Sequence, residues 1–146
     1  GLSNVFSEDL SIEELIKRFI DGFMETIKEN PRVPMFLAHE LSQGGKTVSR
    51  TFSAVIEQLP DIGPWKLLDL LKKARAEGQI YASVDPRQFL LTLVGSCLYF
   101  FFAEPIVNTI FVGPDAFDRD QFLEERKAAI YNTLLFGIKK HGDTLS

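Results

Sequence analysis

Apolar residues recur every three or four positions after Ser11, and this is the clearest pattern in the chain. Ser11-Ile-Glu-Glu14 has the form of a capping box, which marks the beginning of a helix. The spacing behind it predicts an amphipathic helix over residues 11–29. Asn30-Pro31 suits the start of a second helix, which we expect to end near Ser42, before a Gly-Gly pair.

The same periodicity predicts a helix over residues 46–59 and another over residues 65–77. Proline and glycine at residues 60–64 break or kink the chain between them. Gly78 follows the second helix in the position of a C-cap.

The helix predicted over residues 86–103 is apolar on nearly every side. Asp85-Pro86 suits its start, and Glu104-Pro105 is expected to interrupt it, leaving a short turn to Val112. Its uncharged part, residues 88–103, is shorter than the roughly 20 apolar residues that span a bilayer, so we interpret it as a buried helix and not as a membrane span. One small domain cannot cover all of it, so we expect a second surface to cover the rest.

A last helix is predicted to begin near residue 118 or 120 and to reach about residue 140. No alternating strand pattern is present. The expected fold is therefore all-α, a bundle of about six helices. Residues 11–140 would form the domain, with a linker at 1–10 and a flexible tail at 141–146.

Composition excludes several classes of protein. The chain has 146 residues and a net charge of -4, which is unfavourable for gripping nucleic-acid phosphates. One cysteine, Cys97, cannot form an internal disulfide, and no signal peptide is recognised, so we expect a cytoplasmic protein. The two histidines are far apart and no metal-ligand spacing occurs, so neither a metal nor another cofactor is expected.

Catalytic chemistry is not indicated, because no nucleophile, base and orienting acid come together. Cys97 is interpreted as a small core residue. Glu104 has two interpretations: a carboxylate in an apolar wall that binds a ligand, or a residue at a helix start beside Pro105. His39 is equally open, as a hydrogen-bonding group in a pocket or as an exposed histidine.

The order of several segments resembles the ligand-binding and dimerisation domain of TetR-family transcriptional regulators, over about residues 11–140. The segments are Glu29-Asn30-Pro31-Arg32-Val33-Pro34-Met35-Phe36-Leu37, Glu40-Leu41 with Gly44-Gly45, Ala76-Glu77-Gly78-Gln79-Ile80, Asp85-Pro86-Arg87, and Leu134-Leu135-Phe136-Gly137-Ile138. The family's helix-turn-helix is absent from the chain, which we interpret as a piece of a longer repressor. The resemblance implies contact with DNA only through that missing part.

The resemblance also implies a homodimer, in which the last two long helices, 86–103 and 121–140, pair with their copies as a four-helix bundle. The expected interface residues are Leu91, Val94, Leu98, Phe122, Ala129, Ile130, Thr133, Phe136 and Gly137.

A small-molecule effector is the second partner that the resemblance implies. It would occupy a cavity enclosed by residues 11–29, 46–77 and 86–103, and would change the separation of two DNA-reading heads. The expected wall is apolar with few polar tips, which favours an apolar or amphipathic ligand, and Arg50 or Glu104 could meet a charged group. The wall residues are Phe23, Ile27, Phe36, His39, Phe52, Ile56, Trp65, Leu68, Ser96, Tyr99 and Phe100.

Two alternatives stay open. An all-α homodimeric interaction module would have a filled core and no small-molecule ligand. A small helical enzyme would need a coherent pair of catalytic groups, which the sequence does not supply.

Overall fold

The computed structural model describes residues 10–45, 50, 64–112 and 118–138, and within them the fold is all-α, as predicted. The α-helices are α1 (Ile12–Glu29), α2 (Arg32–Ser42), α4 (Pro64–Ala76), α5 (Pro86–Val107) and α6 (Arg119–Ile138). A π-helical segment, η2 (Asn108–Val112), follows α5 directly. Most of the predicted helix 46–59, most of the 60–64 kink, residues 1–9 of the predicted linker and the tail lie outside the described residues.

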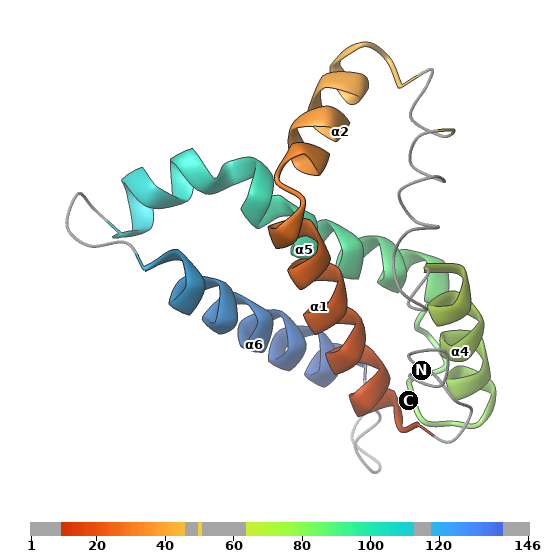
Figure 1. The fold of residues 1–146 in the computed structure, drawn as a ribbon. Helices are drawn as coiled ribbons and strands as arrows, with labels where there is room; N and C mark the ends of the chain where they lie inside the picture. Colours follow the sequence, from red (N-terminus) through yellow and green to blue (C-terminus); the bar gives the residue numbers. More distant parts are fainter. Residues whose placement is uncertain (1–9, 46–49, 51–63, 113–117, 139–146) are drawn as a thin grey trace.

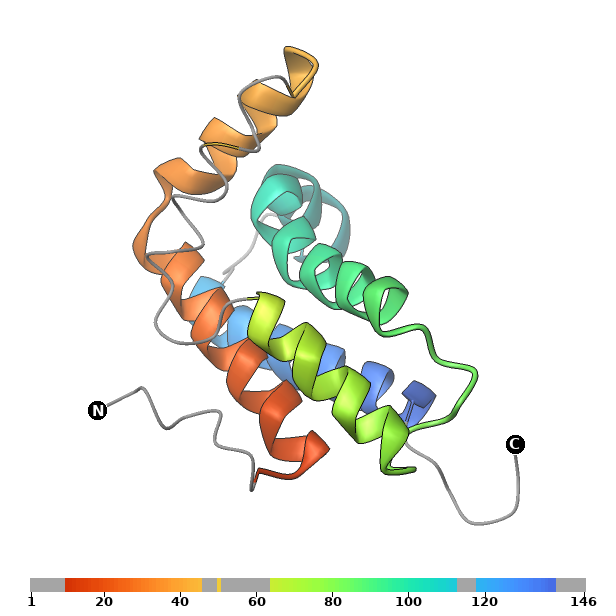
Figure 2. The ribbon, with the colours of Figure 1, turned by 90° about the vertical axis from the view of Figure 1, so that its right-hand side faces the viewer.

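Helix α1 lies at the centre of the bundle and contacts α4, α5 and α6 (Figures 1 and 2). Helices α5 and α6 contact each other and run in opposite directions (Figure 1). Helix α2 contacts α5 and extends away from the other helices (Figure 2). The core therefore lies where α1 meets the other three long helices.

The capping signal and the apolar stripe explain why α1 forms where it does. The Ser11 side-chain oxygen accepts a hydrogen bond from the Glu14 backbone N–H at 3.3 Å, which satisfies one unpaired donor of the first turn. Every apolar residue of the predicted stripe is buried, and these residues are Leu15, Ile16, Phe19, Ile20, Phe23, Met24 and Ile27. Burying one such side chain contributes about 1.5–3 kcal/mol, so the stripe anchors α1 in the fold.

Pro105 does not end α5, which corrects the predicted interruption at Glu104-Pro105. The helix continues to Val107 and then widens into the π-helical η2. Proline removes one backbone donor from a helix but does not stop later residues from bonding. The Asn108 N–H already donates to the carbonyls of Glu104 and Pro105, so the ladder resumes within one turn.

The link between α4 and α5 fixes the beginning of α5. Gly78 closes α4 with a φ of 76°, a left-handed conformation that favours glycine. The Tyr81 N–H donates to the carbonyl of Ile138 at 3.1 Å, which ties the link to the end of α6. The Asp85 carboxylate then caps α5 by accepting from the Arg87 N–H at 2.9 Å.

Candidate functional site

Helix α5 buries one face and leaves an apolar face exposed. Leu93, Cys97 and Phe100 lie in the core, each no more than 2% exposed. On the other side Leu91 is 70% exposed and Phe102 is 38% exposed. The residues between them on that side, Val94, Gly95 and Leu98, are half-buried or exposed and carry no charge.

Helix α6, which contacts α5, also leaves small and apolar residues exposed. Phe136 is 63% exposed, and Ala129, Thr133 and Gly137 are also exposed. We call the surface formed by these residues the α5–α6 face; its members are Leu91, Val94, Gly95, Leu98, Phe102, Ala129, Thr133, Phe136 and Gly137.

Two predicted interface residues lie elsewhere. Ile130 is 2% exposed and packs in the core of its own chain, so it is not part of the α5–α6 face. Phe122 is half-buried and stacks on Phe100, with 5.6 Å between the ring centroids. Phe122 therefore joins α5 to α6 within one chain.

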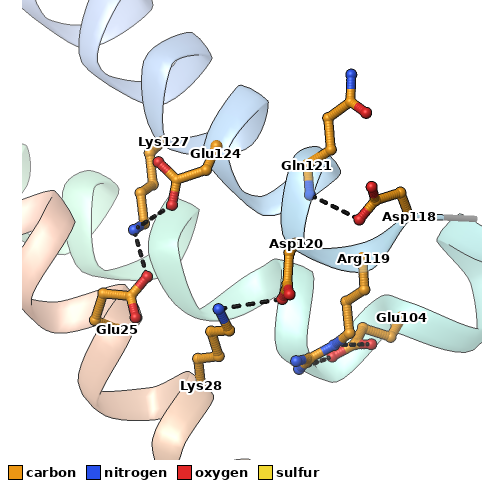
Figure 3. A network of polar contacts seen from close by, with 9 residues as sticks. All are labelled: Glu25, Lys28, Glu104, Asp118, Arg119, Asp120, Gln121, Glu124 and Lys127. Atoms are coloured by element: carbon orange, nitrogen blue, oxygen red, sulfur yellow. Dashed lines mark hydrogen bonds and ion pairs between the residues drawn. The ribbon is translucent and has the colours of Figure 1, made fainter.

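An ion pair fixes α6 against the second half of α5. Arg119 donates through Nε and Nη2 to both carboxylate oxygens of Glu104, at 2.9 and 2.8 Å (Figure 3). The hydrogen bonds that Arg119 donates to the Glu104 carboxylate raise the pKa of the Arg119 guanidinium above its usual value. Glu104 is thus a helix-interior residue held by a bidentate pair, an arrangement that neither sequence interpretation anticipated.

A second charged cluster joins α1 to α6. Lys127 donates to Glu25 at 2.7 Å and to Glu124 at 2.9 Å (Figure 3), although its side chain is only 7% exposed. Burial alone would lower the pKa of Lys127, but the hydrogen bonds to the two carboxylates outweigh it and raise that pKa. The hydrogen bond from Lys127 in turn lowers the pKa of Glu25. Both groups are therefore charged at neutral pH.

Lys127 was missed by the sequence analysis, although a signal for it exists. Leu123, Lys127, Ile130 and Leu134 follow one another at helical spacing, which places the lysine on the buried stripe of α6. A lysine on the buried stripe of a helix requires a charged partner, because burying an unpaired ammonium costs free energy. The partner, Glu25, comes from the first helix, and no local pattern could have identified it.

A groove between α1 and α6 lies beside this cluster, with a volume of about 370 Å³. Its walls mix charged, polar and apolar groups, so it differs in character from the predicted effector cavity. The lining residues are Lys17, Ile20, Asp21, Glu124, Lys127, Ala128, Tyr131 and Asn132.

The residues predicted for the effector cavity fall into three groups. Phe23, Ile27 and Phe100 are buried in the core, with exposures of 5%, 2% and 2%. Leu68 and Ser96 are half-buried, whereas Tyr99, Phe36 and His39 are exposed.

Three positions of that cavity are not described. Phe52 and Ile56 lie outside the described residues. For Trp65 the backbone is described but the side chain is not. The predicted cavity therefore stays a prediction. Arg50 is exposed.

Among the residues that the structure describes, no group of three metal-ligating side chains comes together. The helix Pro86–Ile110 is long and apolar enough to cross a membrane by length and composition, with one third of the relevant window buried. The core helix of a soluble protein has the same length and composition.

Comparison of the chain with protein-family models, curated proteins and solved structures finds no match. The resemblance to TetR-family regulators therefore stays a prediction that rests on the sequence segments given above.

Proposed function

We propose that the chain is the effector-sensing and dimerisation domain of a TetR-type transcriptional regulator, and that two copies pair through the α5–α6 face. The observation that carries the dimer is the exposed apolar surface of two long adjacent helices. DNA would be contacted by a helix-turn-helix outside this chain.

The chemistry of the α5–α6 face favours an apolar partner. Between Arg87 and Glu104 helix α5 carries no charged residue, and Leu91 is 70% exposed. Covering apolar surface contributes about 25 cal/mol per Å², so a large exposed face of this kind favours association. Single exposed apolar residues are normal, but a row of them along one helix is typical of a protein interface.

The shape of the face favours a second copy as the partner. A two-fold dimer brings the same surface of both chains together, so large residues must meet small ones. The face contains both kinds: Leu91 and Phe136 are large, whereas Gly95, Ala129 and Gly137 let backbones approach. Helix α5, at about 1.5 Å per residue, is about 33 Å long, enough for an interface of roughly 800 Å² per partner.

The sensing part of the proposal rests on the family resemblance and on the position of two half-buried residues. Leu68 on α4 and Ser96 on α5 come from helices that contact each other. An apolar or amphipathic molecule held between those helices would act through its different affinities for two arrangements of the dimer.

Analytical ultracentrifugation of a matched pair of variants tests the dimer. Leu91→Glu places a charge on the α5–α6 face, and Leu41→Glu makes the same change on α2, where Leu41 is 59% exposed. Both side chains are already exposed, so both variants should fold. We expect the wild-type chain and Leu41→Glu to sediment as dimers, and Leu91→Glu as a monomer. A monomeric wild-type chain at micromolar concentration would contradict the proposal.

Trp65, the one tryptophan in the chain, provides the test of sensing. Its fluorescence should change saturably on addition of an apolar or amphipathic compound that also raises the unfolding temperature. A dimer that gives no such response to a broad panel of these compounds would favour the interaction module without a small-molecule ligand. The two experiments separate dimerisation from sensing.

A further inference from the structure

Three cationic side chains meet around a hollow between the end of α4 and the beginning of α5. The hollow has a volume of about 410 Å³ and is lined by Lys72, Arg75, Asp85, Pro86 and Arg87. Three cations against one carboxylate leave two positive charges in excess. The whole chain has a net charge of -4, so the local charge is opposite in sign to that of the molecule.

The fold holds this hollow in place. Arg75 donates from Nε to the carbonyl of Ala82 at 2.9 Å, which anchors the guanidinium to the link between the helices. Only Nε is used in that contact, and an arginine has further N–H donors in the same plane. Pro86 is buried and begins α5, so the floor of the hollow belongs to a regular helix.

Asp85 does not neutralise Lys72 and Arg75. Its carboxylate accepts from the Arg87 N–H at 2.9 Å and from Nη2 of Arg87 at 3.2 Å. These contacts with Arg87 lower the pKa of Asp85, so the carboxylate is ionised and is paired with Arg87. Among the described residues that line the hollow, the positive charge without a carboxylate partner is therefore that of Lys72 and Arg75.

We propose that this hollow binds a phosphate group, either of a small soluble phosphate or of a lipid headgroup. Arginine presents planar donors that match phosphate oxygens, and lysine adds a compact charge. The volume lies in the range of small-ligand sites, about 300–1,000 Å³. A long polyanion such as DNA would meet the net negative charge of the chain, whereas a single phosphate group meets only the hollow.

Isothermal titration with pyrophosphate and flotation with vesicles form the two arms of the test. The vesicles are made of phosphatidylcholine with and without phosphatidic acid. Lys72→Gln removes one uncompensated charge, and Arg75→Lys keeps the charge but loses the planar donors. Lys66→Gln is the matched control, since Lys66 is exposed on α4 and does not line the hollow. We expect Lys72→Gln and Arg75→Lys each to weaken binding about tenfold, the loss of one charge-assisted contact, and Lys66→Gln to leave it unchanged.

Either source of phosphate supports the proposal if the effect is confined to the hollow. Saturable binding of pyrophosphate that Lys72→Gln weakens assigns a soluble phosphate. Flotation only with phosphatidic acid, weakened by Lys72→Gln, assigns a lipid headgroup. No binding in either arm would overturn the proposal, and so would equal weakening by Lys66→Gln and Lys72→Gln. Circular dichroism of each variant confirms that the fold is intact, and Arg75→Lys serves as the readout if Lys72→Gln does not fold.

Discussion

Lys127 of α6 donates a 2.7 Å hydrogen bond to Glu25 of α1, across 102 positions of sequence. The lysine side chain is nearly covered, whereas the Glu25 side chain is 40% exposed. The two partners are therefore unequal: the glutamate can return to water when the pair is broken, but the ammonium cannot. This asymmetry determines how variants at the two positions should differ.

Glu25→Gln should destabilise the fold by about 1–2 kcal/mol, because it leaves a covered ammonium with Glu124 as its remaining carboxylate partner. Lys127→Met should cost less, because its carboxylate partners are partly exposed and a methionine fills the same space. The double variant should then be no less stable than Glu25→Gln alone. Urea unfolding of the four proteins measures the cycle, and equal costs for the two single variants would contradict the asymmetry.

The lowered pKa of Glu25 gives this pair a defined pH dependence. A carboxyl group whose pKa is depressed below its ordinary 4.5 in the folded chain adds stability above that value. The contribution disappears as the pH falls from 4.5 through the folded pKa. The difference in unfolding free energy between wild type and Glu25→Gln should therefore be constant near neutral pH and shrink in acid. Urea unfolding at a series of pH values measures it, and a difference that grows in acid would contradict the assignment.

Helix α1 shows what local patterns can predict. A capping serine and apolar residues at helical spacing are sufficient, because the helix needs only its own cap and one buried face. The structure confirms the beginning of α1 within one residue and the burial of the whole stripe. The predicted end of α5 was wrong, because it was inferred from Pro105 alone. Pro105 weakens a helix locally, and backbone hydrogen bonds beyond it decide whether the helix continues.

The charged clusters could not be predicted from local patterns, because their members come from different helices. Glu104 and Arg119 belong to different helices, and the pairing of such residues depends on the packing of α5 against α6. The same holds for the side of α5 that faces the core. Periodicity treats Leu91 and Leu93 alike in a helix that is apolar all round, but Leu93 is fully buried and Leu91 is 70% exposed. Only tertiary packing separates a core residue from a candidate interface residue here.

The bidentate pair between Arg119 and Glu104 should be sensitive to geometry as well as charge. Glu104→Gln should cost about 1 kcal/mol, since the side chains are partly exposed. Arg119→Lys keeps the charge but cannot donate to both oxygens in one plane, so it should cost nearly as much. Arg87→Lys is the control, because its pair with Asp85 lies on the surface and should have no measurable effect. Thermal and urea unfolding give the comparison.

Cys97 should be unreactive in the folded chain. It is fully buried, and this burial raises the pKa of its thiol to about 12, so the reactive thiolate is scarce at pH 8. A thiol reagent such as 5,5′-dithiobis(2-nitrobenzoate) should therefore label the native protein only as fast as the chain unfolds. In urea the single cysteine should react at once and give one equivalent. Labelling of the native protein at the rate of free glutathione would contradict the burial.

Two glycines should respond with opposite signs to the same substitution. Gly78→Ala should destabilise the fold by about 1–2 kcal/mol, because Gly78 has a φ of 76°, which alanine adopts at a cost. The added Cβ itself would meet no atom within 4 Å. Gly95 lies inside α5 with no atom near an added Cβ, so Gly95→Ala should stabilise the single chain by about 0.5–1 kcal/mol.

The proposed dimer adds a second readout at Gly95. A bulky Gly95→Leu should fold, because its side chain points into open space in one chain, but it should weaken the dimer if a partner packs closely there. Sedimentation and urea unfolding of the three variants separate these effects. A Gly95→Leu chain that unfolds at the wild-type urea concentration and sediments as the same dimer would show that the second copy does not pack over Gly95.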